Sequence, residues 1–344
     1  MKIAVIGATG NLGTALLRRL SREAGATEVV GVARRIPDRD RQYAEVQWHA
    51  VDVSKPDARA LLAPALHGVD AVVHLAWALQ PNHVEKAMWR TNVHGTAAVL
   101  DAAVDAGVPH VLVASSVGAY SPGPKSRRVN EDWPTGGLAT SHYSRYKAIN
   151  ERRLDDFEGA HPSVVVTRLR PGLVFQSKAA SEIARLFAGP FVPRRLLGRL
   201  RSPIVTLPSQ LISQVVHADD VADAFWRAIE RRQGGAFNIA AEPVVTPEVL
   251  AGALGGRAVP IRAAVVRALM WATWKARLQP SDPGWLDIAT TVPVMSTERA
   301  RTLLGWAPTI SSTDALRELL DGLAAADGEA GSPPLGGGGA RRAF

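Results

Sequence analysis

Short apolar runs alternate with amphipathic stretches over residues 1–175 of the chain. Most of the apolar runs are rich in Val, Ile and Ala throughout, which is typical of strands covered on both faces. The predicted strands are Lys2–Ile6, Glu28–Ala33, Val46–Val51, Ala71–Leu75, His110–Ala114 and Ser163–Leu169. The predicted helices between them are Asn11–Glu23, Pro56–Leu66, Asn82–Ala106 and Ser141–Gly159. This order predicts an α/β fold with a doubly wound parallel Rossmann sheet, whose ligand crevice lies at the carboxyl ends of the strands.

The regularity fades after Pro171. The elements predicted there are the strand Ala236–Ile239 and the helices Asp219–Arg232, Pro247–Leu254, Ala263–Arg277, Thr297–Leu304 and Thr313–Ala325. We expect a dinucleotide-binding Rossmann domain over residues 1–175, with 214–240 returning to it. A smaller C-terminal substrate-binding α/β region would comprise 176–213 and 241–326. The Gly/Pro/Ser-rich residues 327–344 are expected to form a disordered tail.

Composition excludes several classes of function. The chain of 344 residues has no cysteine, which excludes disulfides, thiolate metal sites and a cysteine nucleophile, and we expect no metal site. No apolar run approaches the roughly 18–20 residues of a membrane span, and the first strand leaves no room for a signal peptide, so we expect a cytoplasmic protein without a membrane partner. The net charge of +8 comes from basic residues interleaved with acidic ones. No nucleic-acid-binding motif accompanies it, so no nucleic-acid partner is expected.

A glycine-rich loop, Gly7-Ala8-Thr9-Gly10-Asn11-Leu12-Gly13, joins the first predicted strand to the first predicted helix. Its glycines permit a tight turn, close approach of the backbone to a pyrophosphate and close packing of helix on strand. The pyrophosphate would lie on free N–H groups at the helix N-terminus. The predicted cofactor-binding residues of this loop are Gly7, Thr9, Gly10, Asn11, Leu12 and Gly13.

The end of the second strand indicates which dinucleotide is bound. NAD enzymes place an acidic residue there, whereas NADP enzymes supply arginine for the 2′-phosphate. This strand ends in Ala33-Arg34-Arg35, which favours NADP over NAD through Arg34, although Arg34 can instead stack on adenine or remain solvated. Asp52, after the third strand, is expected either to bind the adenine amino group or to cap the following turn.

Tyr143 and Lys147 are four residues apart and therefore lie on one face of a predicted helix. A tyrosine titrates near ~10 and needs a positive charge beside it to exchange protons at neutral pH. Lys147 supplies that charge. Ser116 follows the fifth strand, where it can orient a substrate oxygen toward Tyr143, and its neighbour Ser115 is better placed to shape the turn.

Taken together, these motifs resemble the extended short-chain dehydrogenases/reductases, the group that includes NAD-dependent epimerases and dehydratases. The similarity extends to about residue 325 and includes segments in the order found in that family. These further segments are Asp52-Val53, His74-Leu75-Ala76, Thr91–Thr96, Arg168–Phe175, Val216–Ala222, Phe237–Ala240 and Ala300–Pro308.

The resemblance implies a role for each site residue. Ser116, Tyr143 and Lys147 would be catalytic, with Tyr143 as the acid/base and Lys147 holding the nicotinamide ribose and lowering the tyrosine pKa. Val53, Leu75, Ala76 and Pro171 would line the cofactor groove. It also implies a possible homodimer, formed through the helices at Asn82–Ala106 and Ser141–Gly159.

Departures from subfamily patterns favour a dehydrogenase or reductase. Val117 and Gly118 stand where sugar dehydratases carry an Asp-Glu pair, and Arg170-Pro171 stands where nucleotide-sugar epimerases carry Asn-Pro. An epimerase with tightly bound NAD nevertheless stays open, because Arg170 can contact phosphate. An NADP-sensing regulator is a third alternative, although such proteins typically lose the Tyr-Lys pair.

Two features bear on the small-molecule substrate. Five arginines lie where the family builds its substrate lid, and they can either clamp a diphosphate or form a solvated face: Arg185, Arg194, Arg195, Arg199 and Arg201. Four tryptophans suit an apolar pocket for a ring or acyl substrate, or else belong to the core: Trp77, Trp271, Trp274 and Trp285.

Overall fold

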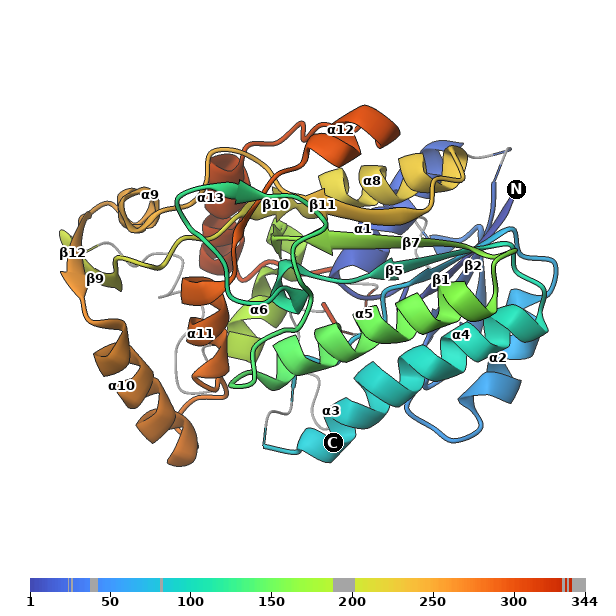
Figure 1. Cartoon of the computed structure of the whole chain (residues 1–344), viewed down its shortest axis with the longest axis horizontal. Helices are drawn as coiled ribbons and strands as arrows, with labels where there is room; N and C mark the ends of the chain where they lie inside the picture. The colour runs from blue at the N-terminus through green and yellow to red at the C-terminus, as the bar shows by residue number, and fades with distance from the viewer. Residues whose placement is uncertain are drawn as a thin grey trace.

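The computed structural model describes the chain except for residues 24, 26, 38–42, 81–82, 188–201, 330–331, 333 and 336–344. A seven-stranded parallel sheet lies at its centre, in the order β3-β2-β1-β4-β5-β7-β11 (Figure 1). Its strands are β1 (Lys2–Ile6), β2 (Glu28–Ala33), β3 (Val46–Ala50), β4 (Ala71–His74), β5 (His110–Ala114), β7 (Val165–Pro171) and β11 (Gly235–Ile239). The strand order reverses between β1 and β4, where a doubly wound sheet forms its ligand crevice. The predicted fold class is confirmed.

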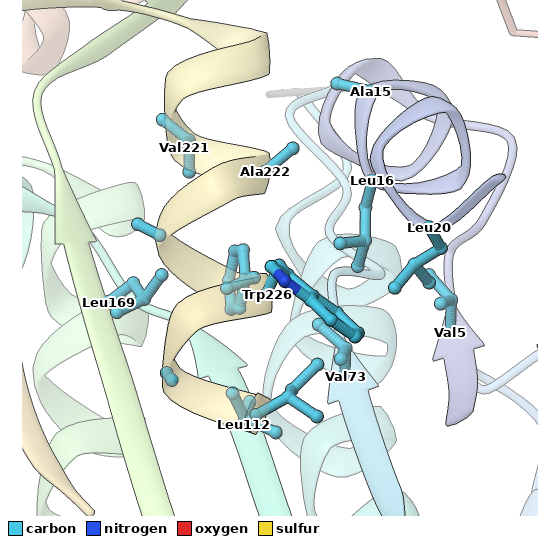
Figure 2. Packing of buried hydrophobic residues seen from close by; sticks show 14 of the residues in the cluster. Val5, Ala15, Leu16, Leu20, Val73, Leu112, Leu169, Val221, Ala222 and Trp226 are labelled. Carbon is cyan, nitrogen blue, oxygen red and sulfur yellow. The ribbon is translucent and has the colours of Figure 1, made fainter. Parts of the chain in front are cut away.

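Helices cover both faces of the sheet (Figure 1). Those of the two layers are α1 (Asn11–Leu20), α2 (Ala58–Leu66), α4 (Gly95–Asp105), α5 (His142–Ala160) and α8 (Ala218–Glu230). Side chains alternate along a strand, so each face of the sheet has its own hydrophobic core. Ile3 and Val5 belong to the core beneath α1 and α8. Ala4 and Ile6 belong to the core beneath α2, α4 and α5. Figure 2 shows Trp226 of α8 among the apolar side chains between α1 and the sheet.

The predicted helix Asn82–Ala106 is divided in the structure, and Asn82 lies outside the described residues. It consists of α3 (Glu85–Trp89), a π-helical turn η3 (Arg90–His94) and α4. The π-helical turn carries Asn92, whose side-chain amide accepts from the Ala78 N–H at 2.7 Å and donates to the Ala78 carbonyl at 2.8 Å. Asn92 therefore fixes the chain that follows β4, as a structural rather than chemical residue.

Three two-stranded parallel sheets lie outside the main sheet. They pair β8 (Leu173–Phe175) with β10 (Val215–His217), β9 (Ile204–Pro208) with β12 (Arg257–Ile261), and β6 (Arg128–Val129) with β13 (Val294–Met295). Further helices are α6 (Ala180–Phe187), α9 (Pro247–Ala253), α10 (Ala263–Lys275), α11 (Gly284–Thr291), α12 (Glu298–Leu304) and α13 (Ser312–Ala325). Single helical turns occur at η1 (Ser21–Glu23), η4 (Val117–Ala119) and η5 (Ser177–Ala179). The division into two domains stays a prediction.

The described part of the predicted tail differs from the disordered segment expected. Glu329, Ser332 and Leu335 are buried. The Ser332 hydroxyl donates to the Thr9 carbonyl at 2.5 Å, and Glu329 pairs with Lys178 at 2.7 Å. A composition rich in Gly and Pro does not reveal such contacts, because single buried residues make them. In the part of the chain that the structure describes, no helix is both long and apolar enough to cross a membrane.

Candidate active site

A pocket opens at the carboxyl ends of the central strands and runs from the glycine loop to α11. The predicted residues that line it are Gly7, Gly10, Asn11, Leu12, Gly13, Leu75, Ala76, Ser116, Tyr143, Lys147 and Pro171. Thr9, Arg34, Asp52 and Val53 are not among its lining residues. The fold thus brings the predicted catalytic residues and most of the predicted cofactor-binding residues to one cavity.

The glycine loop has the geometry that a pyrophosphate requires. Gly7 has φ of +90°, and a Cβ on Gly13 would lie 2.3 Å from the Gly7 carbonyl oxygen. Gly10 caps α1 without a side chain, so the first amides of the helix face the pocket unobstructed. The Asn11 amide donates to the Val174 carbonyl at 3.2 Å, tying the loop to β8. These residues fit a dinucleotide.

The residues predicted to contact the adenosine lie outside the lining of the pocket. Arg34 is exposed after β2. The Asp52 carboxylate accepts hydrogen bonds from the Ser54 N–H at 3.0 Å and the Ser54 hydroxyl at 2.7 Å, so it caps the turn, the second of its two expected roles. Val53 packs against Gly95, where an added Cβ would lie 2.9 Å from its side chain. In this structure Asp52 and Val53 stabilise the loop after β3 instead of lining the pocket.

Ser116 and Tyr143 both line the pocket. The Ser116 hydroxyl caps the η4 turn by accepting from the Gly118 N–H at 3.0 Å. Burial raises the pKa of Tyr143 to about 12, and the Ser116 hydroxyl acts in the opposite direction. Burial is the dominant cause of this shift, and the expected lowering of the Tyr143 pKa by Lys147 stays a prediction.

A backbone carbonyl and two aromatic rings surround the Lys147 ammonium beside Tyr143. Its ammonium donates to the Ala114 carbonyl at 2.8 Å and lies 3.5 Å from the centre of the Trp77 ring and 5.7 Å from that of Tyr143. Burial lowers the pKa of Lys147 to about 7, against the opposing effect of Glu151. The lysine can therefore change charge near neutral pH.

A buried ionic network lies directly behind these residues, and sequence reasoning missed it. Glu151 accepts from the Ser115 hydroxyl at 2.5 Å and from the Arg170 guanidinium at 2.9 and 2.8 Å. Arg170 also donates to the Tyr120 hydroxyl at 2.9 Å. The interpretation of Arg170 as a contact for a substrate phosphate is therefore wrong in this structure, because its guanidinium is buried and bound to Glu151 and Tyr120. The one sequence signal for Glu151 is its position one helical turn after Lys147.

Aromatic rings flank Tyr143 at the far end of the pocket. The centres of the Trp77 and Trp285 rings lie 5.5 and 4.8 Å from that of Tyr143. The other apolar lining residues here include Leu79, Val117, Ile212, Ile288, Ala289 and Val292. Of the four tryptophans considered for the pocket, Trp271 and Trp274 are not lining residues: Trp271 is exposed, and Trp274 stacks on His83.

The arginine-rich segment gives little support for a diphosphate clamp. Arg194, Arg195, Arg199 and Arg201 lie outside the described residues. Arg185, the remaining member, donates to the Pro334 carbonyl at 2.8 Å and does not line the pocket.

Known proteins share both sequence and architecture with this chain. A sterol-4-alpha-carboxylate 3-dehydrogenase (decarboxylating) from human is 25% identical over 174 residues, covering 51% of this chain and 44% of that protein. The chain thus spans less than half the length of this curated relative. An NAD-dependent glucose-6-phosphate dehydrogenase from Haloferax volcanii is 29% identical over 202 residues, covering 53% of this chain and 72% of that protein.

Solved structures show the same fold at lower identity. A UDP-glucose 4-epimerase with UDP-glucose from Thermotoga maritima has a TM-score of 0.69 at 18% identity, covering 93% of this chain and 98% of that one. A Thermus thermophilus UDP-glucose 4-epimerase complex with NAD has a TM-score of 0.68 at 19% identity, covering 94% and 99%. The sequence model of the NAD-dependent epimerase/dehydratase family matches residues 3–240. The chain therefore belongs to the NAD-dependent epimerase/dehydratase family.

Proposed function

We propose that this chain is a dehydrogenase or reductase that interconverts a secondary alcohol and a ketone on an apolar, ring-containing substrate. The observation that carries the proposal is the position of Tyr143, whose ring lies beside Trp77 and Trp285. An aromatic wall of this kind favours apolar rings over a nucleotide diphosphate. Arg170, which offered a phosphate contact, is bound to Glu151.

Each catalytic residue has a distinct task in this proposal. Tyr143 Oη removes the alcohol proton in the oxidative direction and returns it in the reductive direction. The Ser116 hydroxyl donates a hydrogen bond to the reacting oxygen and orients it toward Tyr143. Lys147 holds the ribose hydroxyls and, when protonated, stabilises the tyrosinate. Ala76 and Pro171, which line the pocket, would hold the nicotinamide, and this group would supply or accept the hydride when bound.

We further propose that the enzyme prefers NADP, with NAD as the less favoured cofactor. No acidic residue stands at the end of β2, and Arg34, which is exposed after that strand, would bind the 2′-phosphate. Titration with NADPH and NADH tests the cofactor preference. The proteins compared are the parent chain, Arg34→Asp and the adjacent control Arg35→Asp. We expect tighter NADPH binding by the parent and by Arg35→Asp, and loss of that preference in Arg34→Asp. Equal or tighter NAD binding by the parent contradicts the NADP preference.

Net formation of reduced cofactor tests the reaction itself. A dehydrogenase releases one reduced nicotinamide for each alcohol oxidised, whereas an epimerase returns its hydride to the substrate and accumulates none. We expect reduced cofactor to accumulate with polycyclic secondary alcohols and not with UDP-glucose. Epimerisation of a UDP-sugar without cofactor turnover would establish the epimerase alternative. Tight NADP binding without turnover of any alcohol, ketone or UDP-sugar would favour a regulatory protein.

A further inference from the structure

The helix α10 presents its apolar side to solvent. All of its 13 residues are described, and none is buried. Val265 is 46% exposed, Leu269 61% and Trp271 51%. One stripe of small and apolar residues, at the spacing of a single helix face, runs along the outside: Val265, Ala268, Leu269, Ala272 and Ala276. A surface helix ordinarily turns such a stripe toward the core.

The opposite side of α10 attaches it to the protein. The Arg267 guanidinium makes two hydrogen bonds to the Asp287 carboxylate of α11, at 2.9 and 3.1 Å. The Trp274 ring stacks on His83 with 4.6 Å between ring centres and 9° between planes. These contacts fix the rotation of the helix, so its apolar stripe faces outward. Figure 1 shows α10 projecting beyond α11, away from the central sheet.

Positive charge surrounds this stripe. No acidic residue occurs between Glu248 and Asp282. Arg262, Lys275 and Arg277 are all exposed around the two ends of α10. Apolar side chains, an exposed tryptophan and flanking basic residues are the features of a helix that lies in the interface of an anionic bilayer. A second copy of this chain would bring the same positive charges to the stripe, so repulsion disfavours self-association there.

We propose that α10 docks this protein on the surface of an anionic phospholipid bilayer. Val265 and Leu269 of the stripe enter the interfacial layer, with the exposed Trp271 at the other margin of the outward side, two residues from Leu269. Arg262, Lys275 and Arg277 meet lipid phosphates. The expectation of no membrane partner considered spanning segments, whereas this helix lies along the surface. Because α11 supplies Trp285, Ile288 and Ala289 to the pocket, docking brings the apolar end of the pocket near the lipid. The proposal stands apart from the proposed reaction and does not depend on it.

Vesicle co-sedimentation of the full chain tests this proposal. The probes are phosphatidylcholine vesicles with and without phosphatidylglycerol, at low and high salt. We expect binding to the anionic vesicles, weakened about tenfold or more by high salt or by removal of phosphatidylglycerol. The double variant L269S/W271S should lose about tenfold or more of that binding. Leu303→Ser, which removes another exposed leucine on α12, is the matched control and should bind as the parent does.

Separate measurements distinguish docking from misfolding and from dimerisation. Circular dichroism and cofactor affinity should be the same in the parent and the double variant, because neither Leu269 nor Trp271 lines the pocket. The charge variant R262E/K275E leaves the apolar stripe intact and should also lose binding to anionic vesicles. The proposal is wrong if the parent stays in the supernatant with anionic vesicles or if both variants bind as it does. Conversion of a parent dimer to a monomer by L269S/W271S would instead identify the exposed side of α10 as a subunit interface.

Discussion

The two ends of the pocket differ in what lines them: backbone at one end and side chains at the other. The glycine-loop end uses backbone from one short segment, Gly7–Gly13, whose glycines leave space and whose helix N-terminus offers amides. The α11 end uses side chains from distant segments, with Trp77 after β4 and Trp285 on α11 on either side of Tyr143. Backbone recognition suits the constant part of a cofactor, whereas in the proposed function the side chains at the other end would select the substrate. Proteins of one fold can therefore keep the glycine-loop end and differ in the substrate that the other end accepts.

Removing the tyrosine hydroxyl where the two ends meet should have the largest effect. Tyr143→Phe keeps the ring between the tryptophans but loses the proton-transfer group, so we expect kcat to fall by about 10²–10⁴-fold. Tyr146→Phe is the matched control, because Tyr146 is also buried on α5 but its hydroxyl lies 3.1 Å from Glu85. Initial rates with a turned-over alcohol measure the difference. Comparable activity of Tyr143→Phe and Tyr146→Phe would remove Tyr143 from the mechanism.

Adding a side chain to the glycine loop should weaken cofactor binding without changing the substrate end of the pocket. Gly13→Ala places a Cβ 2.3 Å from the Gly7 carbonyl, and the displaced backbone should weaken cofactor binding by about 10- to 100-fold. Gly252→Ala on α9 is the control, because its Cβ meets no atom within 4 Å. Calorimetric titration with cofactor measures both variants. Unchanged affinity in Gly13→Ala would show that the loop does not cradle the pyrophosphate.

Removing the Trp285 side chain should weaken substrate binding without changing cofactor binding. Trp285→Ala opens the pocket beside Tyr143, so we expect KM for an apolar ring substrate to rise about tenfold while cofactor affinity stays unchanged. Trp271→Ala, assayed without lipid, removes an exposed tryptophan outside the pocket and serves as the control. A weaker cofactor affinity with an unaltered KM would reverse the assignment of the two ends.

A smaller effect should appear in the pH dependence of stability. Burial lowers the pKa of Lys147 to about 7, while the unfolded lysine titrates near ~10.4. Between these values the unfolded chain binds the proton that the folded chain has lost, so this group makes the free energy of unfolding rise with pH. Urea unfolding at several pH values should show a shallower rise in Lys147→Met than in the parent. The exposed control Lys86→Met should retain the parent slope, and an unchanged slope in Lys147→Met would contradict the shift.

Local patterns explain what the sequence could predict. The glycine loop and the Tyr143–Lys147 pair depend on spacings within one turn or helix, and the α/β order depends on hydrophobic runs of the main strands. Trp285 reaches Tyr143 only through tertiary folding, and the small sheets pair strands that are far apart in the chain. The interpretation of Arg170 failed for the same reason, since Glu151 binds it across the interior.

A crystal structure of this protein with oxidised cofactor and a polycyclic secondary alcohol would show whether Tyr143 and Ser116 contact the reacting oxygen. We expect the alcohol oxygen to lie within about 3.2 Å of both Tyr143 Oη and Ser116 Oγ. The substrate ring should pack against Trp77 or Trp285, and the cofactor pyrophosphate should lie at Gly10–Gly13. An alcohol bound away from Tyr143, or a nucleotide diphosphate filling the aromatic end of the pocket, would contradict these expectations.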